Sequence, residues 1–76
     1  MNDFYVYEWY NIDTNEVFYV GKGCKNRYKN KTDRNKWFIE YINNNNVDSR
    51  IVKSNLKEEE AFSFEKQLTE YYKNLN

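Results

Sequence analysis

The chain has 76 residues, and its 12 Lys and Arg are balanced by 12 Asp and Glu, so it carries no net charge. It has no histidine and one cysteine, which excludes histidine acid–base chemistry, histidine metal sites and an intrachain disulfide framework. No apolar run approaches the ~20 residues of a membrane-spanning helix and no signal-peptide pattern opens the chain, so we expect a cytoplasmic protein with one small domain.

The first expected element is a β-hairpin. Residues 4–10 and 16–21 are rich in aromatic and β-branched side chains, and the polar residues 11–15 separate them. If Tyr10 lies opposite Glu16, the register places Tyr7 directly opposite Tyr19. Because side chains alternate along a strand, we expect both phenols on one face of the sheet.

The charges are segregated along the chain although they sum to zero. Residues 1–21 contain acidic side chains and no Lys or Arg. The basic side chains that follow, opposed only by Asp33, are Lys22, Lys25, Arg27, Lys29, Lys31, Arg34 and Lys36. Such a cationic stripe is either the solvated face of a helix or a surface that binds a polyanion. Its position directly after the hairpin favours the binding of nucleic acid.

The rest of the chain alternates between helical and strand patterns. We expect a short basic helix over 24–31, a helix over 33–43, a third strand over 48–56 and a last helix over 57–75. These elements predict an α/β (α+β) sandwich in which a three-stranded antiparallel sheet is flanked by three helices.

The last helix carries a carboxylate on its apolar face. Its expected apolar stripe is Ala61, Phe64, Leu68, Tyr71, Tyr72 and Leu75. Glu65 lies in the same sector, where a charge is poorly solvated and needs a partner. From the helix alone, that partner is either Arg27, in a structural ion pair, or a divalent metal ion.

Taken in order, these residues resemble the signature of the GIY-YIG endonucleases. The tripeptide Tyr5-Val6-Tyr7 is followed after eleven residues by Tyr19-Val20-Gly21, then by Arg27 and by Glu65 on a late helix. The sequence departs from the family pattern in two places, because Tyr5 replaces the glycine of the first motif and the histidine that many members carry after the arginine is missing. Members usually extend beyond the third helix to a supporting asparagine, so that support is here either Asn76 or absent, and the chain is either truncated or a minimal nuclease domain.

The resemblance implies that residues 1–76 form one nuclease domain that hydrolyses DNA with a single Mg²⁺ or Mn²⁺ ion. Tyr7 would be the general base, Tyr19 would orient it or hold the water, Arg27 would bind the scissile phosphate and Glu65 would ligate the metal. Gly21 would allow close backbone approach. The DNA backbone would be held by Lys22 and the basic residues beyond it, which are Lys25, Lys29, Lys31, Arg34 and Lys36.

Phosphodiester chemistry explains why these side chains are needed. One Mg²⁺ ion held by a single glutamate stabilises only part of the negative charge on the phosphate, so a second cation must stabilise the rest. A guanidinium suits this task because it can bind two phosphate oxygens. Without histidine, a phenol is the remaining candidate base, and it needs a cationic environment because a free tyrosine pKa is about 10.

Two other functions stay open from the sequence. One is a non-catalytic nucleic-acid-binding module of the same fold, and the other is a small interaction domain such as a phage protein that engages a host factor. The frequent Asn, Lys, Tyr and Ile indicate an AT-rich genome, that of a phage or a low-GC bacterium. We expect substrate preference to come from a separate specificity domain or a partner protein.

Overall fold

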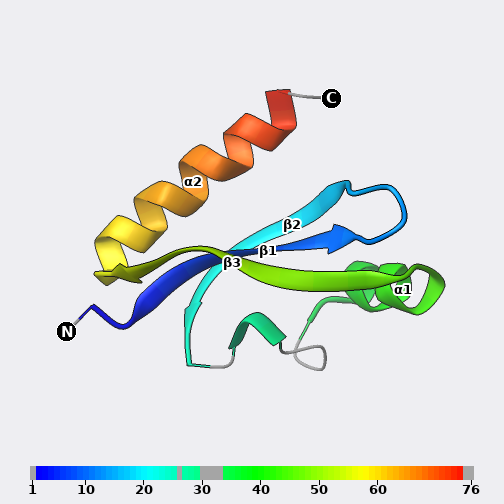
Figure 1. Cartoon of the computed structure of the whole chain (residues 1–76), viewed down its shortest axis with the longest axis horizontal. Coiled ribbons are helices and arrows are strands. Elements are labelled where there is room, and N and C mark those ends of the chain that lie inside the picture. The colour runs from blue at the N-terminus through cyan, green and yellow to red at the C-terminus, as the bar shows by residue number, and fades with distance from the viewer. Residues whose placement is uncertain (1, 26, 30–33, 75–76) are drawn as a thin grey trace.

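A computed structural model describes residues 2–25, 27–29 and 34–74 of the chain. Three antiparallel strands form one sheet in the order β2-β1-β3. The elements are β1 (Phe4–Asn11), β2 (Val17–Cys24), the short 3₁₀ helix η1 (Arg27–Lys29), α1 (Lys36–Asn44), β3 (Val47–Leu56) and α2 (Glu58–Asn74) (Figure 1). None of the helices in these ranges is long and apolar enough to cross a membrane.

The central strand β1 has an apolar side chain on both faces of the sheet. Tyr5, Tyr7 and Trp9 face one side, where they form a core with Phe38 of α1. Val6 faces the other side, where it packs with Leu56 and with Ala61 of α2. The two helices therefore cover opposite faces, and β1 is buried because it lies between both neighbouring strands and both layers.

Each α-helix begins at a polar cap. The Asn35 side chain accepts a hydrogen bond from the Phe38 backbone N–H (2.8 Å) at the start of α1. At the start of α2, the Lys57 backbone N–H donates to Glu60 Oε1 (2.9 Å). Three acidic residues in the first turn of α2 also interact favourably with the positive end of the helix dipole.

One charged side chain of β1, Glu8, is buried under α2. It is 3% exposed. Its Oε1 accepts from Arg50 Nε (2.6 Å) and its Oε2 accepts from the Tyr72 hydroxyl (2.7 Å). Burial, followed by the hydrogen bond to Glu8, raises the pKa of Tyr72 to about 12, so Tyr72 stays a neutral donor. This network fastens the C-terminal half of α2 to the sheet.

Tyr72→Phe is expected to lower the free energy of unfolding by about 1–2 kcal/mol, because a buried carboxylate oxygen loses its donor. The raised folded-state pKa means that the stabilisation is fully present below pH 10 and is lost as pH rises towards 12. Urea titration at neutral pH measures the difference, with Tyr71→Phe, whose side chain is 58% exposed, as the matched control. Equal stability of Tyr72→Phe and the unmodified chain would contradict this role.

The hairpin, the third strand and the last two helices are confirmed, with ends that differ by at most three residues from the predicted ones. The predicted helix over 24–31 is wrong, because β2 continues to Cys24 and the described part of this segment holds only η1. Within the described residues the sheet is therefore flanked by two α-helices rather than three. The physical reason is a tight turn at Lys25, whose φ of 56° is left-handed and incompatible with an α-helix.

The predicted pairing of Tyr7 with Tyr19 is also wrong, although their shared face is correct. Tyr7 pairs with Gly21, and Tyr19 pairs with Trp9. The observed strand register differs from the predicted one by two residues. One comes from the turn, where the Asn11 N–H donates to the Glu16 carbonyl (2.9 Å), and the other comes from a bulge next to Tyr10. Two offsets of one residue restore the alternation, so both phenols remain on one face.

Candidate active site

A cavity of about 410 Å³ lies at the outer edge of β2. We call it the edge cavity, and its lining residues are Phe4, Tyr7, Tyr19, Gly21, Lys22, Gly23, Cys24 and Glu65. It brings together three of the four predicted catalytic side chains, Tyr7 of β1, Tyr19 of β2 and Glu65 of α2. Because β2 is an edge strand, the half-buried Glu65 lines the same cavity as the two phenols although α2 packs on the opposite face of the sheet.

Gly21 makes room for the Tyr7 ring. A Cβ atom at position 21 would lie 2.7 Å from both Cζ and the hydroxyl oxygen of Tyr7, and 3.0 Å from Cε1 of Tyr19. The Tyr7 side chain therefore passes directly over the Gly21 backbone. This close approach lets a residue of the central strand reach a cavity at the edge of the sheet.

Gly21→Ala is expected to displace the Tyr7 ring and to destabilise the fold by about 1–3 kcal/mol, as for an overpacked core. Combining it with Tyr7→Ala should give less than the sum of the two losses, because the second change removes the clash. Urea titration of both single variants and the double variant measures the coupling. Cys24→Ala, on the same strand and in the same cavity, is the control, and strictly additive losses would contradict the clash.

Arg34 contacts the tyrosines directly. Its Nη1 donates to the Tyr7 hydroxyl (3.0 Å). Its guanidinium lies 5.0 Å from the ring centroid of Phe38 and 5.2 Å and 5.6 Å from those of Tyr19 and Tyr7. Sequence reasoning placed Arg34 among the DNA-backbone contacts and missed this position, because neither motif spacing nor helical periodicity links Arg34 to Tyr7.

Tyr5 is a second residue whose role sequence reasoning missed. It is buried, its hydroxyl donates to the Lys25 carbonyl (2.8 Å), and it accepts from the Tyr28 N–H (3.1 Å). Tyr5 thus connects the turn that leads into η1 to the central strand. The position of Tyr5 on a buried strand was the sequence signal for this role, because a buried phenol requires a polar partner.

Arg27 is the first residue of η1, and its side chain lies outside the described part of the structure.

The predicted DNA-contacting lysines stand in different surroundings. Lys22 lines the edge cavity and its Nζ lies 3.9 Å from Glu58 Oε2. Lys25, Lys29 and Lys36 are exposed. Lys31 and Asn76 lie outside the described residues. Contact of these lysines with DNA stays a prediction.

The two phenols lie close together in a partly desolvated environment, with ring centroids 6.2 Å apart. Burial raises the pKa of Tyr19, and its neighbours Tyr7 and Glu65 raise it further, while the Arg34 charge opposes them. Tyr19 is therefore neutral near pH 7 and keeps its proton to donate.

The donor set of the edge cavity suits a hard cation with few protein ligands. Glu65 is the sole carboxylate among the lining residues, and no group of three Cys, Asp or Glu side chains is gathered within residues 2–25, 27–29 and 34–74. Mg²⁺ binds through one or two carboxylates and keeps several waters, so Glu65 fits Mg²⁺. The same set does not fit a tetrahedral zinc site.

Comparison with known proteins gives no match to a protein-family model, to a curated protein or to a solved structure. The fold and the site define a small α+β domain in which two phenols and a carboxylate from three elements share one cavity.

Proposed function

We propose that the chain is a metal-dependent DNA endonuclease of the GIY-YIG type that hydrolyses phosphodiester bonds with one Mg²⁺ or Mn²⁺ ion. The observation that carries the proposal is the edge cavity, where Tyr7, Tyr19 and Glu65 converge from β1, β2 and α2. The order of the two tripeptides, the arginine and the helical glutamate in the sequence supports the same class.

In this proposal Tyr7, in its deprotonated form, is the general base. It takes a proton from a water whose oxygen forms a bond to phosphorus, while the P–O ester bond on the opposite side breaks and the leaving oxygen is protonated from solvent. Arg34 donates to the Tyr7 oxygen, so its positive charge offsets the negative charge of the phenolate. Tyr19 keeps its proton and donates it in a hydrogen bond that orients Tyr7 or the water.

The remaining charges act on the phosphate. Arg27 binds the scissile phosphate, for which a planar guanidinium is well suited. Glu65 would hold the metal ion, which when bound would supply positive charge for the phosphate and the leaving oxygen. Lys22 and the exposed lysines beyond it would contact the DNA backbone without reading sequence.

Incubation of the chain with supercoiled plasmid tests the proposal. Relaxed circles are expected with Mg²⁺ or Mn²⁺, and EDTA should prevent their formation. If neither metal supports nicking while a gel shift shows DNA binding, the nuclease proposal is wrong. The chain would then be a non-catalytic nucleic-acid-binding module of the same fold.

A further inference from the structure

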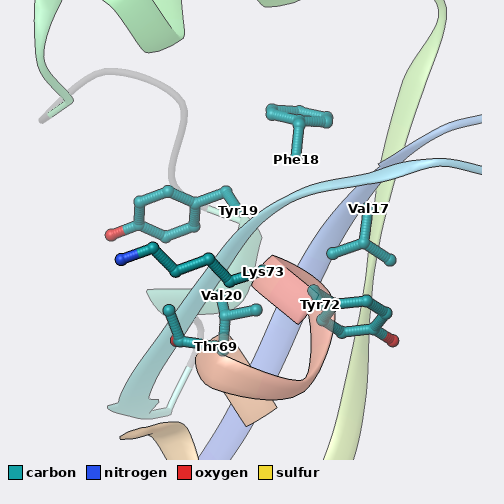
Figure 2. A pocket seen from close by; sticks show the side chains of 7 residues that line it. All are labelled: Val17, Phe18, Tyr19, Val20, Thr69, Tyr72 and Lys73. Carbon is teal, nitrogen blue, oxygen red and sulfur yellow. The ribbon is translucent and has the colours of Figure 1, made fainter. Parts of the chain in front are cut away.

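A second cavity, of about 370 Å³, adjoins the edge cavity between β2 and the C-terminal half of α2 (Figure 2). We call it the Lys73 cavity, and it is lined by Val17, Phe18, Tyr19, Val20, Thr69, Tyr72 and Lys73. Tyr19 lines both cavities. A molecule bound against Tyr19 in the edge cavity can therefore continue along β2 into the Lys73 cavity.

Two of the polar side chains that line the Lys73 cavity donate hydrogen bonds to other residues of the chain. The Thr69 hydroxyl donates to the Glu65 carbonyl (2.8 Å), and the Tyr72 hydroxyl donates to Glu8. The amino group of the exposed Lys73 and the hydroxyl of Tyr19 end on the same side of the cavity in Figure 2. Val17 and Val20 add apolar surface next to them. The cavity thus presents a cation beside an apolar wall, and none of the described residues that line it carries a carboxylate.

At the other end of the edge cavity, acidic neighbours offset the positive charge of Lys22. Lys22 is shared there with a third cavity, whose other lining residues are Glu58, Glu59 and Phe62. The Lys22 amino group lies 3.9 Å from Glu58, which already offsets its charge. These two carboxylates weaken the attraction of Lys22 for a phosphate, whereas none of the described residues that line the Lys73 cavity is acidic. A polyanion that contacts Lys22 is therefore also attracted towards Lys73.

We propose that the Lys73 cavity is a subsite for the nucleotide next to the scissile phosphate on a DNA strand, an inference that rests on the proposed function. Lys73 pairs with the phosphate of that nucleotide, and Val17 and Val20 contact its sugar or base. From Gly21 to Val17 the strand extends about 13 Å, at ~3.3 Å per residue. This length exceeds the rise of one nucleotide in a DNA strand, about 3.4 Å in a duplex, so a neighbouring nucleotide can be accommodated.

Fluorescence anisotropy with a labelled single-stranded oligodeoxythymidine, in EDTA so that nothing is cleaved, tests the subsite. Lys73→Ala should weaken binding roughly three- to fivefold, as for one exposed charge contact. It should also reduce the slope of log affinity against log salt by about 0.7, the value for one phosphate on a single strand. Lys73→Arg should retain the slope, and Lys57→Ala, an exposed lysine directly before α2, should leave both quantities unchanged.

A second measurement locates the oligonucleotide. Its addition should shift the methyl resonances of Val17 and Val20 in the unmodified chain. Unchanged affinity and salt slope in Lys73→Ala, unshifted methyl resonances, or no binding by the intact chain would each overturn the subsite. A chain that nicks plasmid but shows any of these results overturns the subsite alone. A chain that binds through Lys73 but never nicks overturns the nuclease function alone.

Discussion

Glu65→Gln is expected to abolish Mg²⁺-dependent nicking of plasmid DNA while leaving DNA binding largely intact. The substitution keeps the shape of the side chain and removes the carboxylate that, among the described residues, lines the edge cavity. The Thr69 hydroxyl bonds to the Glu65 backbone carbonyl, so that contact is unaffected. Since a catalytic metal supplies several kcal/mol of charge stabilisation, the rate should fall on the order of 10³-fold or more.

The control for this experiment is another glutamate of the same helix. Glu70 is an exposed residue of α2 and is not among the residues that line the edge cavity. Glu70→Gln removes an equal charge from a place outside the edge cavity, so its nicking rate should stay close to that of the unmodified chain. Nicking by Glu65→Gln at the unmodified rate would show that the metal is held elsewhere.

Tyr7→Phe is expected to lower the single-turnover cleavage rate by roughly 10²–10⁴, the usual contribution of a positioned general base. Tyr7 is 1% exposed, and its ring packs 6.0 Å from Tyr5 and over Gly21. Phenylalanine keeps this packing and removes only the hydroxyl that accepts from Arg34. The fold should therefore persist while the proton acceptor is lost.

Tyr71→Phe is the matched control for Tyr7→Phe, because it removes an exposed hydroxyl from α2. Anisotropy with uncleaved DNA should show that both variants bind like the unmodified chain. A Tyr7→Phe variant that cleaves at the unmodified rate would remove Tyr7 from the chemistry, and the base would then have to be sought elsewhere.

Local patterns in the sequence predicted most of the fold. Aromatic and β-branched runs marked the hairpin, and helical periodicity marked α1 and α2. The predicted helix over 24–31 failed because the left-handed turn at Lys25 and its tether to Tyr5 are not visible in local propensity. The predicted register was wrong because the turn pairs Glu16 with Asn11 rather than with Tyr10 and because a bulge next to Tyr10 adds a second residue, and strand alternation alone reveals neither.

The candidate site was predictable where residues lie on periodic elements. Tyr7 and Tyr19 share a face by alternation, and Glu65 stood out as a charge on the apolar stripe of a helix. The exposed Tyr71 was wrongly included in that stripe, because the buried face of α2 is narrower than its sequence pattern. The contacts of Tyr5 and Arg34 were missed because they join segments that only the tertiary structure brings together.

The central claim is that a divalent ion is held against two phenols by a glutamate that belongs to the helix on the other face of the sheet. Paramagnetic broadening by Mn²⁺ tests it without any cleavage. Amide resonances of Tyr19, Gly21 and Gly23 should broaden at low Mn²⁺ concentration in the unmodified chain and stay sharp in Glu65→Gln. Broadening confined to the acidic first turn of α2, with the β2 signals unaffected, would contradict the claim.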